Sequence, residues 1–354
     1  MSSETDDTVR LNGPRLGERS RFARLWLYTA GAAAVACLAA GGAWWNLRPA
    51  PAPQQIAAPA APSVQPVFAP AAVPSAPVQQ APPAPAPAPP YAPPLASEAA
   101  ILADAPEQLA IYRFGPQPAV VVLQFPSLAD QAGMLNRVAA LLEKEGYPRD
   151  RVLAHDELDA KIRASGIAPE TFYYGHDYRA EDIAHFFTIA SELNPEERQL
   201  QDLVGKLGWR ERGAIGALVS VVRQTPASDI DAASRATILR HELSHGVYFT
   251  DPAYAQYCVR FWNEVLTAQE RALFTSYLQR EGYDPALTDL IINETQAYLI
   301  HTRDPRFFRP VDVGLTQSRA EELRRLFIAG MPPGWLRDAA ATPAPAQPIP
   351  VRVP

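Results

Sequence analysis

The stretch that organises the sequence is Leu239-Arg-His-Glu-Leu-Ser-His-Gly-Val247. His241 and His245 are four residues apart, so on an α-helix both imidazoles lie on the same face and can bind one ion. Glu242 follows His241 by about 100° around the helix, which brings it near the ion without making it a ligand. Apart from Arg240, which should face outward, the flanking residues are uncharged. The pattern therefore predicts a buried metal-binding helix over residues 233–248.

A third ligand is expected on a later helix. Catalytic zinc usually has three protein ligands and one open position for water, and no histidine follows Gly246 closely. Glu294 is the best candidate, because the residues around it on the predicted helix 287–302 are largely apolar. An unpaired carboxylate would be costly in such a stretch. The alternative is an ordinary solvated glutamate on a helix surface.

Together, His241-Glu242-x-x-His245-Gly246 and Asn293-Glu294-x-x-Ala297 resemble the gluzincin metallopeptidases, the thermolysin-like clan. The resemblance is confined to these segments and does not place the chain in a named family of the clan. It implies that His241, His245 and Glu294 bind Zn²⁺ and that Glu242 is the general base and acid. It also implies hydrolysis of peptide bonds in a protein or peptide substrate.

The chain departs from the gluzincin pattern in two ways. Several gluzincin families have an aspartate four residues after the ligand glutamate, where it orients a zinc-bound histidine, whereas this chain has Tyr298 there. The two motifs are also further apart than in thermolysin. The residue that stabilises the transition state is unassigned, and the candidates are Tyr298, His301 and Tyr283.

Composition restricts the class of function. The net charge is -6 and the pI is about 5.6, so there is no basic surface for nucleic acid. The only two cysteines, Cys37 and Cys258, lie in different contexts, which argues against a disulfide and excludes a cysteine-based metal site. Any metal ion must therefore be held by histidine and carboxylate.

The N-terminal part of the sequence predicts a membrane anchor. Residues 25–46 are apolar over a length of about 20 residues, which suits a bilayer span, and tryptophans lie near both ends. Four arginines precede the segment, which favours a cytoplasmic tail at residues 1–24 and an extracytoplasmic remainder: Arg15, Arg19, Arg21 and Arg24. A cleaved signal peptide is the alternative. We expect a single-pass protein of the cell inner membrane whose catalytic domain is periplasmic.

Three further segments follow the predicted anchor. Residues 47–98 are rich in proline and alanine and predict an extended linker without a core of its own. Residues 99–338 predict one metallopeptidase domain, and residues 339–354 share the composition of the linker. Such a layout is typical of a component of the cell envelope.

The expected fold of the domain is α+β, mainly helical and zincin-like, with a short sheet. Strands are predicted at residues 119–124 and 216–225, where β-branched residues form short apolar runs. The second of these strands precedes the metal-binding helix, so we expect it to pair with an extended peptide substrate. Two other functions remain open, a catalytically inactive zinc-binding protein and an envelope-spanning interaction protein.

Overall fold

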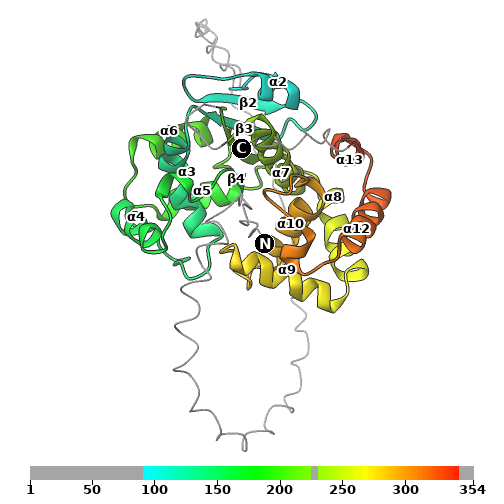
Figure 1. The fold of residues 1–354 in the computed structure, drawn as a ribbon. Coiled ribbons are helices and arrows are strands. Elements are labelled where there is room, and N and C mark those ends of the chain that lie inside the picture. Colours follow the sequence, from blue (N-terminus) through cyan, green and yellow to red (C-terminus); the bar gives the residue numbers. More distant parts are fainter. Residues whose placement is uncertain (1–90, 225–229, 343–354) are drawn as a thin grey trace, which may run out of the picture. The chain divides into compact units, whose positions relative to one another are not determined.

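The computed structural model describes residues 91–224 and 230–342 (Figure 1). The predicted anchor at residues 25–46 and most of the linker lie outside these residues. Among the helices of the described residues, none is both long and apolar enough to cross a membrane.

A five-stranded sheet forms the centre of the domain, in the order β1-β2-β3-β5-β4. Its strands are β1 (Leu95–Ala96), β2 (Ala110–Phe114), β3 (Val120–Phe125), β4 (His176–Arg179) and β5 (Ala217–Val222). β3 and β5 are parallel, β1 is parallel to β2, and the β2–β3 and β4–β5 pairs are antiparallel. Every residue of β3 and β5 is buried, as expected for apolar strands that are covered on both faces.

The first group of helices follows the strands in the N-terminal half of the domain. Its members are α2 (Glu98–Ala103), α3 (Leu128–Leu142), α4 (His155–Ala164), the short 3₁₀ helix η2 (Pro169–Thr171), α5 (Ala180–Ile189) and α6 (Pro195–Lys206). Ser127 caps α3, because its hydroxyl accepts a hydrogen bond from the backbone N–H of Asp130. In Figure 1 the green helices α3 to α6 lie on one side of β4.

The second group begins with the long helix α7 (Ala232–Thr250), which carries the metal-binding motif and packs against β4 and β5. It continues with α8 (Pro252–Arg260), the π-helical turn η3 (Phe261–Val265), α9 (Ala268–Arg280), α10 (Thr288–Gln296) and a second π turn, η4 (Ala297–His301). The chain then forms α11 (Pro310–Val313), α12 (Gln317–Gly330) and α13 (Trp335–Ala341). Figure 1 shows α8 to α12, yellow to red, on the side of β4 opposite to α3–α6.

The α+β class with a short sheet is confirmed, and so are the two predicted strands. The folded part of the chain begins before residue 99, because β1 pairs with β2 and α2 starts at Glu98, where Ser97 caps it. The predicted pairing of a peptide substrate with residues 216–225 is wrong. β5 already pairs with β3 on one edge and β4 on the other, so it has no edge left for an added strand.

Gly246, directly after the motif, explains how α7 approaches the sheet so closely. A Cβ atom at this position would lie 2.7 Å from Cγ1 of Val120 on β3. Any side chain larger than hydrogen would therefore push the helix off the strand. Glycine at this position lets the histidines of α7 sit deep in the core, where all of His241 to Val247 are buried.

Candidate metal centre

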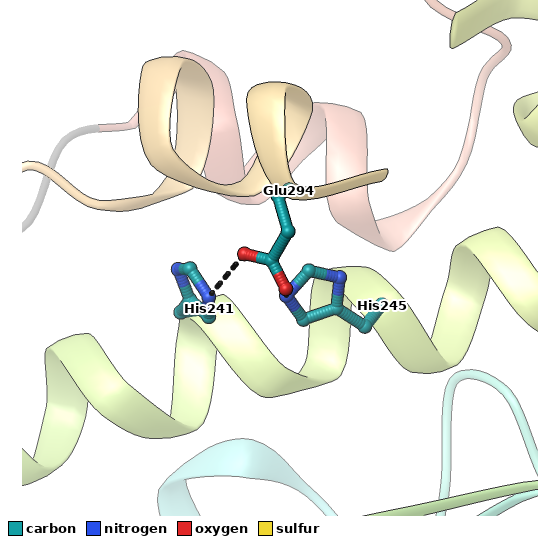
Figure 2. Close-up of side chains that lie close together, drawn as sticks. All are labelled: His241, His245 and Glu294. Atoms are coloured by element: carbon teal, nitrogen blue, oxygen red, sulfur yellow. Dashed lines mark ion pairs between the residues drawn. The ribbon is translucent and has the colours of Figure 1, made fainter. Parts of the chain in front are cut away.

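His241, His245 and Glu294 meet in the interior between α7 and α10 (Figure 2). His241 Nε2 lies 3.7 Å from Glu294 Oε2, and His245 Nε2 lies 3.8 Å from Glu294 Oε1. The side chains are at most 1% exposed. The three residues predicted as ligands are therefore brought together by the fold, and we call them the metal cluster.

The distances between these atoms are more typical of ligands around a shared ion than of hydrogen-bonded partners. Both distances are too long for hydrogen bonds, and neither His241 Nε2 nor His245 Nε2 has a hydrogen-bond partner among the described residues. Two ligands bound to tetrahedral zinc at about 2.0–2.1 Å are separated from each other by about 3.3 Å. Small side-chain movements would therefore let the metal cluster bind a zinc-sized ion.

Thr302 orients the first histidine. His241 Nδ1 lies 2.8 Å from the hydroxyl of Thr302, and that hydroxyl donates to the backbone carbonyl of Ala297 at 3.0 Å. Because the hydroxyl proton is used in this second bond, Nδ1 of His241 must be the donor in the first. The tautomer therefore leaves the Nε2 lone pair directed at the metal cluster, which is the usual arrangement around a metal-bound histidine. Thr302 thus orients His241, a role for which the sequence has no aspartate four residues after Glu294.

Asp177 on β4 is a second residue that the sequence did not reveal. Its carboxylate lies 3.7 Å from His245 Nε2, and it forms a possible metal group with Glu242 and His245. The carboxyl groups of Asp177 and Glu242 are also joined by a hydrogen bond. Asp177 falls in a four-residue strand with no apolar run, so no pattern in the sequence marks it as part of a site.

Four carboxyl groups are buried around this point, and each is at most 7% exposed: Glu143, Asp177, Glu242 and Glu294. Burial raises the pKa of all four, and mutual repulsion raises the pKa of the first three further. Burial also lowers the pKa of His241 to about 3 and that of His245 to about 4, so both imidazoles are neutral ligands at physiological pH. Such an excess of buried acid over base is expensive unless protons or a cation offset it. A divalent ion would do so directly.

Two short segments pair beside the metal cluster and form a strap, which we define as residues 143–145 paired with residues 282–284. The N–H of Glu145 donates to the carbonyl of Gly282 at 3.0 Å, and the N–H of Asp284 donates to the carbonyl of Glu143 at 2.9 Å. Arg149 adds an ion pair with Asp284 at 3.1 Å. The strap joins the end of α3 to the loop between α9 and α10, so it connects the two helix groups.

The strap also carries two side chains towards the third ligand. The hydroxyl of Tyr283 stabilises the ionised form of Glu294 and opposes the rise of its pKa. Glu143 accepts a hydrogen bond from Tyr173 at 3.1 Å, and the negative charge of Glu294 raises the pKa of Glu143. A cavity of about 520 Å³ between residues 303 and 324 includes none of the metal-cluster residues.

The two predicted catalytic candidates, Tyr298 and His301, have different surroundings in the structure. The ring of Tyr298 packs edge-on against His241 with 4.9 Å between centroids, so it lies beside the metal cluster. His301 instead lies 3.2 Å from the hydroxyl of Tyr254, which donates to Gln296. His301 therefore belongs to a buried polar network between α8 and the end of α10, and the structure does not group it with the metal ligands.

The comparisons with known proteins supply no relative for this site. No family model, no curated protein and no solved structure matches the chain.

Proposed function

We propose that the chain is a zinc-dependent metallopeptidase of the gluzincin type, with His241, His245 and Glu294 as ligands and Glu242 as the general base. The observation that carries the proposal is the meeting of three buried ligand atoms that lack hydrogen bonds to one another. Zn²⁺ would polarise the scissile carbonyl and make water a stronger nucleophile at neutral pH.

The residues of the chain would divide the remaining work. Glu242 accepts the proton of the attacking water and transfers it to the leaving amine. Thr302 fixes the tautomer of His241, and the hydrogen bond from Tyr283 favours the ionised form of Glu294 against the effect of burial. β4 is the outermost strand on this side of the described sheet, so an extended peptide would pair there.

The proposal is tested with two variants of the full-length chain and a library of quenched fluorescent peptides. Glu242→Gln should keep bound zinc at the wild-type stoichiometry and lose hydrolysis, since it removes the base and no ligand. Glu294→Ala should lose the metal. Hydrolysis by Glu242→Gln at the wild-type rate would refute the assignment of the base, and full zinc occupancy in Glu294→Ala would refute the ligand set.

A second function is favoured by one observation, the burial of every ligand atom. Structural zinc sites are closed, whereas catalytic sites keep a position open to substrate. A catalytically inactive zinc-binding protein of the cell envelope would fit such burial. Zinc at full occupancy without cleavage of any peptide in the library would favour this function over the first.

The cellular setting is also a proposal. Residues 25–46 would anchor the chain in the inner membrane, and the linker would hold the domain in the periplasm. Fusions of a periplasm-dependent reporter enzyme after residue 24 and after residue 98 test the topology. We expect activity only from the second fusion, and activity from the first would reverse the orientation.

A further inference from the structure

Asp177 approaches the metal cluster at His245, whereas Glu294 approaches both histidines. Its Oδ2 lies 3.7 Å from His245 Nε2, while the two Glu294 oxygens lie 3.7 and 3.8 Å from the two imidazoles. The Asp177 side chain is 7% exposed. Two carboxylates therefore approach His245 Nε2 at nearly equal distances, one from α10 and one from β4.

The gap between Asp177 and His245 is not a hydrogen bond, because 3.7 Å exceeds the range for N–H···O contacts. His245 Nε2 has no hydrogen-bond partner among the described residues, although it is fully buried. His245 is the residue shared by the two groups of possible metal ligands, one with His241 and Glu294 and the other with Asp177 and Glu242.

The surroundings supply the second argument. A catalytic zinc site with three ligands normally keeps its fourth position open to water, but here every ligand residue is buried. Two neutral imidazoles and two carboxylates would cancel the charge of a divalent ion, which suits an interior site.

From this geometry we infer that Asp177 is a fourth protein ligand, which closes the coordination sphere in the resting form of the site. The inference rests on the proposed metal centre and describes its regulation. Because Asp177 is hydrogen-bonded to Glu242, its departure from the ion would leave the open position beside the general base. Release of Asp177 would then convert a latent site into an active one.

The test compares zinc affinities of full-length variants, measured by competition with a chromophoric chelator. The loss of zinc affinity in Glu294→Gln is the loss expected for a ligand. Thr302→Val sets the loss for a residue that only orients a ligand, which is about 10- to 100-fold. Asp159→Asn, on the exposed face of α4, is the control for removing an aspartate elsewhere. Circular dichroism establishes that each variant is folded.

We expect Asp177→Asn to weaken zinc binding by more than Thr302→Val does, towards the loss seen in Glu294→Gln, and Asp159→Asn to bind as wild type. A loss in Asp177→Asn no larger than that in Thr302→Val overturns the inference and leaves the three-ligand metal centre standing. Failure of the wild-type chain to bind zinc overturns both.

Discussion

Substitution of Gly175 by alanine should disable the general base without touching a ligand. Gly175 directly precedes β4, and a Cβ atom there would lie 2.3 Å from Oε1 and 2.7 Å from Cδ of Glu242. Ordinary contacts begin at 3.4 Å. The Glu242 carboxyl group would therefore have to retreat by about 1 Å, since the new methyl group is fixed to the backbone of a sheet.

The size of the effect follows from that displacement. A misplacement of about 1 Å in a catalytic group costs on the order of 100-fold in rate, or about 2.7 kcal/mol of transition-state stabilisation. The zinc ligands are not among the atoms that the new methyl group would meet first. We therefore expect kcat to fall by about 100-fold while zinc stoichiometry stays at the wild-type value.

The assay is hydrolysis of the best peptide found in the library, with zinc measured in the same samples. Gly133→Ala on α3 is a matched control, because its Cβ would meet Glu196 at an ordinary distance of 3.8 Å. A Gly175→Ala enzyme whose kcat stays within about threefold of wild type would refute the placement of Glu242 as the base.

Three further outcomes are expected. Thr302→Val should weaken zinc binding by about 10- to 100-fold, because His241 loses its orienting acceptor; wild-type affinity in a chelator titration would contradict this. Gly246→Ala should lower the free energy of unfolding by about 1–3 kcal/mol through overpacking against Val120, and Val120→Ala in the same chain should recover part of the loss in urea denaturation. The metal-free protein should become less stable as the pH rises. Burial raises the pKa of Glu143 to about 8 from 4.5, so the folded form retains a proton that the unfolded form releases. The stabilisation that this proton gives the folded form is complete below pH 4.5. It declines by about 1.4 kcal/mol per pH unit until the pH passes the pKa of Glu143 in the folded form. The melting temperature of the metal-free protein between pH 6 and pH 9 measures this decline, and a melting temperature that does not change with pH would contradict it.

Sequence patterns predicted the elements that have a repeating apolar face or a capping signal. Thr267 and Glu270 form the capping box that starts α9, as expected from their spacing. Ser318 and Glu321 have the same spacing in the sequence, but the N-cap of α12 is Thr316. β1, β2 and β4 were missed. These strands are short or only partly buried, and their pairing depends on partners distant in the sequence.

The candidate site likewise contains residues that the sequence predicts and residues that it does not. The meeting of His241, His245 and Glu294 could be predicted, because one helical repeat places the histidines together and an apolar context marks the glutamate. Asp177 could not be predicted, because only the antiparallel pairing of β4 with β5 brings it to His245. Thr302 could not be predicted either, because it depends on the π turn that precedes it.

The site depends on the number of residues in the segment that contains the π turn η4. The turn spans Ala297 to His301, and Thr302 follows it directly with its hydroxyl on His241. Adding or removing one residue in the α-helical part between Glu294 and Ala297 would rotate Thr302 relative to Glu294 by about 100° around the axis. Insertions and deletions here would thus abolish a function that substitutions only weaken. Descendants of this sequence should vary in composition along α10 and η4 while conserving the number of residues between Glu294 and Thr302.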